Sequence, residues 1–318
     1  MDKPSRLAHF PVAFFAVIMG LAGLTIAWRK AEVVFKPVLS VSCLVLPFAI
    51  GTFMLVAAVY ALKLLRHPQE VARELRHPVK LNFFPAMSIG MLLLAIPLLD
   101  TDPEAARGLW TAGAALHLAF TLYVMNAWIH HTHFEIAHVS PAWFIPVVGN
   151  VLVPVAGVKL GMPEVSWFFF SIGLVFWPVL FTIVMYRLFF HAPLPERLTP
   201  TLFILIAPPA VGFIAYVNLT GGIDAFARVL YYVGLLLTLL MASNALRFLR
   251  VKFFLSAWAY SFPLAAITIA SLIMAEQVGG EAFEWLAMGL LALLTTVVAA
   301  LCARTLLAVA RREICVED

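Results

Sequence analysis

The densest group of titratable side chains lies where an apolar stretch ends, and it reads HHTHFEIAH over residues 130–138. Imidazole and carboxylate groups this close together could supply nitrogen and oxygen ligands to a divalent metal. The spacing, however, does not match the His-Glu-x-x-His pattern of a catalytic zinc helix. We therefore predict a set of interfacial histidines that holds no metal, made up of His130, His131, His133, Glu135 and His138.

His117 is the only charge-capable side chain well inside a predicted membrane span. A buried ionisable group is costly in hydrocarbon, so an intramembrane histidine is by default a candidate for function. A hydrogen-bonded packing role explains this residue equally well, and both interpretations stay open. No nucleophile–base pair and no cofactor motif accompany the histidines, so we expect neither enzyme activity nor a cofactor.

The elements that position these residues are membrane helices. Of the 318 residues, 63% are hydrophobic and only 12% are charged, whereas a soluble domain carries about 25% charged residues. Each membrane helix needs roughly 20 apolar residues, so the chain has room for about ten helices on short loops. No segment is polar enough for a separate soluble domain, and we predict one transmembrane domain over residues 1–318.

Apolar runs predict ten membrane helices, numbered here in chain order: 10–28, 38–65, 82–99, 108–131, 142–160, 165–190, 200–220, 225–249, 254–276 and 282–309. Cytoplasmic loops are rich in Lys and Arg, which sets the orientation. Fifteen of the 21 Lys and Arg residues fall on the side that holds both chain ends. This predicts cytoplasmic termini, and it assigns the net charge of +4 to those loops rather than to nucleic-acid binding.

Every odd-numbered predicted helix contains proline, whereas only the second and sixth of the even-numbered helices do. A regular recurrence of this kind indicates an internal repeat, here a helical hairpin present five times. Kinked helices are tolerated in membranes where neighbours or water satisfy the freed carbonyls. We predict an all-α integral membrane protein in which five hairpins form a ring, with the odd helices inside and lining a central pore. Their prolines are Pro11, Pro85, Pro146, Pro208 and Pro263.

Small residues mark one face of several odd helices. On the first helix, Ala16 and Gly20 belong to a stripe of small residues at steps of three or four, which suits close helix packing or the wall of a narrow passage. On the ninth, Ser261 and Thr268 share a face that has Phe262 as the one large ring at its edge. The fivefold repeat favours the passage. The predicted pore-lining residues are Ala16, Gly20, Pro85, Ser88, Pro146, Asn150, Pro208, Gly212, Ser261, Pro263, Ala265 and Thr268.

Three stretches resemble one known family: Phe10-Pro11 through Trp28, Trp143–Asn150 and Trp258–Pro263. They are similar to the tellurite-resistance TehA-like family, which includes plant slow anion channels and malic acid permeases and is often labelled as dicarboxylate transporters. The resemblance implies five hairpins around a pore, a phenylalanine of the ninth helix as its gate, and a homotrimer. By position, Phe262 matches that gate. Phe15-Ala16 departs from the family's common Phe-Gly, and the extra methyl could narrow the pore.

The resemblance implies an anion channel, and the residues suggest how it would conduct. A wall of odd helices offers no fixed cation and no carboxylate, so hydroxyl and amide groups would donate hydrogen bonds to a partly dehydrated anion. Selectivity among small inorganic anions would follow the ease of dehydration, favouring large monovalent ions such as nitrate or iodide over chloride. The expected donors are Ser88, Asn150, Ser261 and Thr268.

Two other functions stay open. A proton-coupled secondary transporter of C4-dicarboxylates such as malate would need an ionisable group near the midplane, for which His117 is the candidate. A tellurite-resistance or efflux permease is the third possibility. In every case the expected partners are inorganic or small organic anions and membrane lipids, with no nucleic acid. The long tails of the plant members are absent, which favours a prokaryotic protein of the inner (plasma) membrane.

Overall fold

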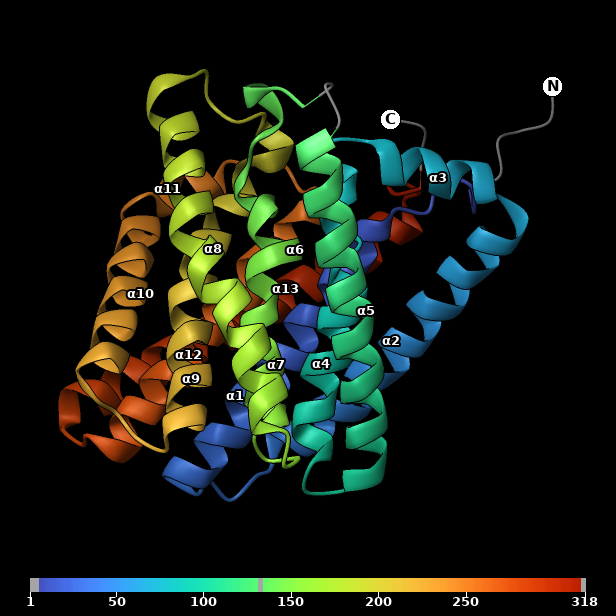
Figure 1. Ribbon diagram of the computed structural model, residues 1–318. Helices are drawn as coiled ribbons and strands as arrows, with labels where there is room; N and C mark the ends of the chain where they lie inside the picture. Colours follow the sequence, from blue (N-terminus) through green and yellow to red (C-terminus); the bar gives the residue numbers. More distant parts are fainter. Residues whose placement is uncertain (1–5, 131–133, 316–318) are drawn as a thin grey trace.

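The computed structural model describes residues 6–130 and 134–315, and within these ranges every regular element is a helix (Figure 1). The predicted all-α class is thereby confirmed. By length and composition, nine of the described helices suffice to cross a membrane. The fifth predicted span, 142–160, is instead a shorter broken segment, Pro141–Gly157.

Five inner segments each begin with 3₁₀ turns and continue as α-helix, with proline at or near the change. Proline lacks an N–H and clashes with the carbonyl four residues earlier, so an α-helix starts beside it more easily than it runs through it. The segments are η1 Val12–Phe14 with α1 Phe15–Phe35; η2 Lys80–Phe83 with α4 Ala86–Leu98; η4 Pro141–Trp143, α6 Phe144–Val148, η5 Gly149–Leu152 and α7 Val153–Gly157; η6 Glu196–Ile206 with α9 Ala207–Thr220; and η7 Leu255–Tyr260 with α12 Ser261–Gln277.

Five outer helices follow the inner segments in alternation. In their most apolar stretches 17–33% of the residues are buried, against 72–78% for the four inner segments of membrane length. Their outward surface is apolar, as a lipid-facing surface requires. They are α2 Val41–Arg66, α5 Pro103–His130, α8 Pro163–Phe190, α10 Ala225–Ser243 and α13 Glu281–Ala310, with three short elements between them, α3 Pro68–Arg76, η3 Ile136–His138 and α11 Ala245–Leu249.

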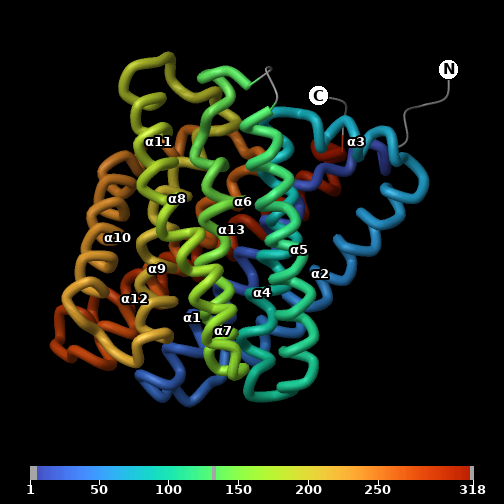
Figure 2. Tube along the Cα trace, in the orientation of Figure 1, coloured from blue at the N-terminus to red at the C-terminus, as the bar shows by residue number. Residues whose placement is uncertain are grey.

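The inner segments contact one another in a consistent order. Helix α1 packs against both α4 and α12, and α9 packs against α12 and α7. Helix α7 in turn contacts α4, and each inner segment also contacts the outer helix that follows it. Figure 2 shows α1 running between α4 and α12. These contacts are what a ring of hairpins requires, and the ring around a pore stays a prediction.

The two ends of the molecule differ in what they carry. At one end, here named the terminal end, the Arg6 guanidinium donates to the Ile314 carbonyl at 3.1 Å, so the first and the last described parts of the chain lie side by side there. Figure 1 places α3 at this end. At the opposite end, named the loop end, Arg29 pairs with Asp100 at 2.7 Å and Lys30 pairs with Glu276. Those pairs tie α1 to its two inner neighbours.

Candidate functional site

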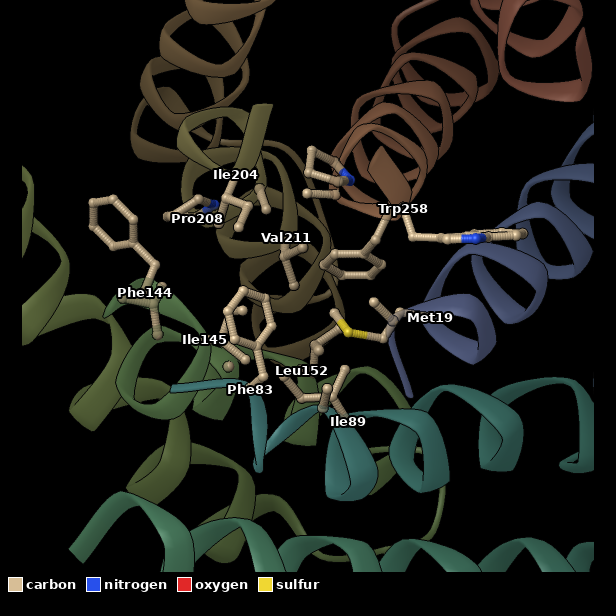
Figure 3. Close-up of a pocket in the computed structure, with 18 of the residues that line it drawn as sticks. Met19, Phe83, Ile89, Phe144, Ile145, Leu152, Ile204, Pro208, Val211 and Trp258 are labelled. Carbon is tan, nitrogen blue, oxygen red and sulfur yellow. The ribbon is translucent and has the colours of Figure 1, made fainter. Parts of the chain in front are cut away.

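A central cavity of about 60 Å³ lies between the five inner segments, all of which contribute to its wall. Figure 3 shows Met19, Phe83 and Val211 pointing into the same space from three of these segments. The volume suits only a few water molecules. The full lining is Ala13, Ala16, Met19, Phe83, Ala86, Ile89, Phe144, Ile145, Val148, Gly149, Val151, Leu152, Ile204, Ala207, Pro208, Val211, Leu255, Ser256, Trp258, Ala259, Phe262 and Pro263.

The wall of the central cavity is almost entirely apolar. In the lining as the structure describes it, no side chain is charged and Ser256 alone carries a hydroxyl. The Trp258 indole N–H is committed to Thr305 Oγ1 of α13 at 2.9 Å, away from the cavity. A surface of this kind cannot replace the hydration shell of an ion, so it resists ion entry by dewetting.

Four of the residues predicted from the sequence line this cavity: Phe262, Ala16, Pro208 and Pro263. Phe262 is half-buried and lies against α1, because a Cβ built on Gly23 would be 3.8 Å from its Cδ2. The ring therefore stands between the small face of α1 and the cavity. Its role as a gate, and the conducting role of the other three, stay predictions.

Three other predicted residues, Gly20, Ser261 and Ala265, lie instead in the interface between α1 and α12. A Cβ built on Gly20 would be 2.3 Å from Ser261 Oγ, and one built on Gly23 would be 2.8 Å from Ala265 Cβ. Ser261 and Ala265 are fully buried, and the Ser261 hydroxyl donates to the Trp258 carbonyl at 2.6 Å. The small stripe of the first helix thus serves close packing along this stretch.

Ser88 and Asn150 lie in a polar cluster with the outer helix α5. Ser88 Oγ is 2.9 Å from His117 Nδ1, and the hydroxyl also donates to the Pro85 carbonyl. The Asn150 amide donates to Thr121 Oγ1 at 3.0 Å, and Thr121 donates to the Pro146 carbonyl at 2.7 Å. Every member is buried, and the hydroxyl and amide donors find acceptors within the cluster, whereas Asn150 Oδ1 has no hydrogen-bond partner among the described residues.

His117 sits at the centre of that cluster. It is fully buried, and a Cβ on Gly149, a residue of the cavity wall, would be 2.8 Å from its Nε2. Within the described part of the chain this nitrogen has no hydrogen-bond partner. The residue therefore lies behind the wall of the central cavity and is separated from it by the backbone of η5.

The last four predicted residues, Pro85, Pro146, Gly212 and Thr268, also lie outside the cavity wall. The Thr268 hydroxyl donates to the Leu264 carbonyl of its own helix at 2.7 Å, which is a common way of satisfying a hydroxyl inside a membrane helix. A Cβ on Gly212 would be 3.8 Å from Leu230 of α10. With Pro85 and Pro146, these residues shape the inner segments without lining the cavity.

Two further polar pairs join different helices within the spans. Trp28 of α1 donates to Thr295 of α13 at 3.0 Å, and the Tyr231 hydroxyl of α10 lies 3.1 Å from Ser271 Oγ of α12. Such bonds satisfy groups that lipid could not. Hydroxyl content alone therefore overestimates how polar a membrane passage is.

Two members of the histidine-rich segment, His131 and His133, lie outside the described residues. Glu135 and His138 form a reciprocal cap on η3, in which the Glu135 backbone N–H donates to His138 Nδ1 at 3.1 Å. No group of three His, Cys, Asp or Glu side chains among the described residues could hold a metal ion. The absence of a metal there stays a prediction.

A second hollow, named here the vestibule, opens at the terminal end and has a volume of about 460 Å³. Sequence reasoning did not predict it. The excess of Lys and Arg at this end was the one signal, but a count of loop residues cannot show which of them face a common space. Its charge-capable side chains are His9, Lys63, Glu70, Arg73, Glu74, His77, Lys80, Arg197 and Glu313.

Several vestibule charges neutralise one another. Lys63, only 1% exposed, pairs with Glu74 at 2.9 Å and donates to the Phe10 carbonyl at 2.8 Å. The Tyr60 hydroxyl donates to the same Glu74 carboxylate. Burial raises the pKa of the Cys315 thiol at the edge of the vestibule, against the opposing effect of nearby cations. The thiol accordingly adds no negative charge there at neutral pH.

Together, the apolar spans and a cavity walled by all five kinked inner segments define a polytopic membrane protein of the channel and transporter class. The model of the SLAC1 family, described as a voltage-dependent anion channel, matches residues 9–306, and the chain belongs to that family. This confirms the resemblance found in the sequence.

Individual relatives are similar over most of this chain. The S-type anion channel SLAH3 of Arabidopsis thaliana is 28% identical across 95% of the chain, but the match covers 48% of the plant protein. An uncharacterized transporter of Methanocaldococcus jannaschii is 26% identical over 90% of this chain and 91% of its own length. A tellurite resistance protein TehA homolog of Haemophilus influenzae is 27% identical over 84% of this chain and 81% of its own length. The chain thus spans about half the length of the plant channel SLAH3.

Proposed function

We propose that this protein is an anion channel in which small monovalent anions cross the central cavity and Phe262 closes it. The observation that carries the proposal is an apolar cavity of about 60 Å³ walled by all five inner segments, with the Phe262 ring in the wall. Both the family and the S-type channel relative support anions as the cargo.

The proposed barrier is desolvation. A cavity with room for only a few waters cannot hold a fully hydrated ion, and its wall offers almost no donors to replace the lost water. Anions that dehydrate easily, such as nitrate or iodide, would then pass more readily than chloride. The hydroxyl and amide donors first assigned this role are engaged elsewhere, so the apolar wall itself would set the preference.

The proposed arrangement in the cell follows from charge and resemblance. The ring of five hairpins would span the inner (plasma) membrane of a prokaryote with the terminal end in the cytoplasm, as the basic loops favour. Lipids would cover the outer helices, and three copies would associate as the resemblance implies. In this arrangement the vestibule is the cytoplasmic mouth.

A second candidate is a proton-coupled carrier of C4-dicarboxylates. What favours it is His117, an intramembrane ionisable group with an unpartnered Nε2 beside η5. Against it, the residue stands behind the cavity wall. A role in tellurite resistance rests on the printed name of the bacterial relative alone.

Planar bilayers containing the purified protein would separate these functions. A channel should give unitary anion currents whose reversal potential follows the anion gradient and ignores a pH gradient. Flux without unitary currents, with a reversal potential that shifts with the pH gradient, would instead establish the coupled carrier.

A further inference from the structure

The vestibule and the central cavity meet at a neck. Four residues belong to the lining of both: Ala13, Phe83, Leu255 and Ser256. They come from three different inner segments, so the neck is a junction of segments rather than a groove on one of them. An anion moving between the two spaces passes these residues, and on the cavity side it meets an uncharged wall.

The backbone of Arg197 is held beside this neck by two hydrogen bonds, one to the Arg197 carbonyl and one to the side chain of the preceding residue, Glu196. The Ser256 hydroxyl donates to the Arg197 carbonyl at 2.5 Å. The Lys252 backbone N–H donates to Glu196 Oε1 at 3.0 Å. Both bonds join the start of η6 to the segment leading into η7, while the Arg197 side chain is exposed and lines the vestibule.

The charge of Arg197 is not neutralised locally. Lys63 is paired with Glu74 and Arg73 with Glu70. For Arg197, no acidic side chain in the described part of the chain lies within ion-pair distance. The adjacent Glu196 forms no ion pair with Arg197; its Oε1 accepts from the Lys252 N–H, and the residue does not line the vestibule.

We propose that Arg197 is the anion-capture residue at the neck, holding a small monovalent anion before it sheds water into the central cavity. This rests on the proposed channel function. A guanidinium presents several N–H donors and a permanent charge, and it matches planar oxyanions such as nitrate or carboxylate. Because the side chain remains exposed to water, the anion is held weakly enough to move on, as conduction requires.

The test uses the full-length protein in planar bilayers, with the Phe262→Ala variant as the conducting background. Adding Arg197→Gln should lower single-channel chloride conductance at about 20 mM salt. A unit charge roughly 7 Å from an ion in water changes the local anion concentration about threefold. The loss should nearly vanish at 1 M salt, where the screening length is about 3 Å. Arg197→Lys should restore most of the conductance.

Arg250→Gln is the matched control, since Arg250 is also an exposed arginine near the terminal end but does not line the vestibule. It should leave the low-salt conductance nearly unchanged. If Phe262→Ala carries no anion current, the channel function itself fails. If that background conducts but Arg197→Gln changes nothing at low salt, or Arg250→Gln lowers conductance equally, the capture role is overturned and the channel stands.

Discussion

Helices α1 and α12 each have two faces, and the faces differ in how much room they leave. Between the helices, Gly20 is so close to Ser261 that even a Cβ would overlap it. On the other face, Ala16 and Phe262 border the central cavity. Ser261 and Phe262 are neighbours in sequence, yet Ser261 is buried in the helix interface and Phe262 borders the cavity.

The difference teaches that a stripe of small residues does not by itself mark a passage. Small side chains allow backbones to approach, and that approach closes the space between two helices. The open space lies beside the prolines Pro208 and Pro263, and both bulky and small apolar side chains face it. Mutations on the two faces should therefore have opposite consequences, which makes the comparison testable.

Phe262→Ala should produce the largest effect on transport. If the ring imposes a barrier of about 2.7 kcal/mol, its removal raises anion conductance roughly 100-fold. Stability should fall less than the 3–5 kcal/mol typical of truncating a core phenylalanine, since the ring is only half-buried. Single-channel recording and thermal unfolding in detergent measure the two quantities.

Phe262→Leu should give intermediate conductance. Phe189→Ala on α8 is the control, because Phe189 is 68% exposed on an outer helix and should change neither quantity strongly. A folded Phe262→Ala protein with unchanged, low conductance would place the barrier elsewhere.

Gly20→Ala should instead destabilise the protein with no gain in conductance. The new Cβ would lie 2.3 Å from Ser261 Oγ and 2.8 Å from Trp258 Cε3, and overpacking of this kind costs about 1–3 kcal/mol. Gly289→Ala on α13 is the control, since a Cβ there meets nothing within 4 Å and alanine favours helix by up to about 1 kcal/mol. Thermal unfolding of both proteins reads out the difference.

A double variant, Gly20→Ala with Ser261→Gly, should recover part of the lost stability, because it removes the closest overlap. Equal melting temperatures for Gly20→Ala and Gly289→Ala would show that the two helices can separate at this point. The distinction between a packed and an open face would then fail.

The membrane class and the family could be recognised from the sequence because they depend on composition and on patterns carried by whole segments. Every inner segment contains proline, such as Pro208, at or near the point where it changes to α-helix. Phe262 could be singled out as the one large ring beside a small face. These features are local, so they can be recognised in the sequence without knowing which helix packs against the segment.

Which face of each inner helix borders the cavity could not be predicted. Ser88 and Asn150 looked like donors to an anion, but their partners His117 and Thr121 come from α5, 29 residues away in each case. A helical wheel shows which residues share a face and not what that face meets. The 3₁₀ helix η6, which precedes α9, and the vestibule were not predicted for the same reason, since both depend on contacts between segments.

Ala16→Gly should raise anion conductance, but by less than Phe262→Ala does. The Ala16 methyl borders the cavity, and removing one such group from an apolar wall is worth about 0.8 kcal/mol, or roughly fourfold in conductance at most. Glycine in a helix costs up to about 1 kcal/mol of stability. Ala58→Gly on the exposed surface of α2 carries the same helix penalty and should leave conductance unchanged. Equal conductance for Ala16→Gly and the parent protein would remove Ala16 from the conducting path.

His117→Gln should have the smallest effect on flux, because the imidazole lies behind η5 and not in the cavity wall. The amide of glutamine can still reach a hydroxyl, so the loss of the 2.9 Å contact with Ser88 should cost no more than about 1 kcal/mol of stability. For a channel, the reversal potential in a pH gradient should be the same before and after the mutation. A parent protein whose reversal potential moves with pH, and a variant in which this dependence is lost, would make His117 a proton-coupling group. Since a buried group can act on transport only through the backbone of η5, that result would also mean that the third inner segment moves during the transport cycle.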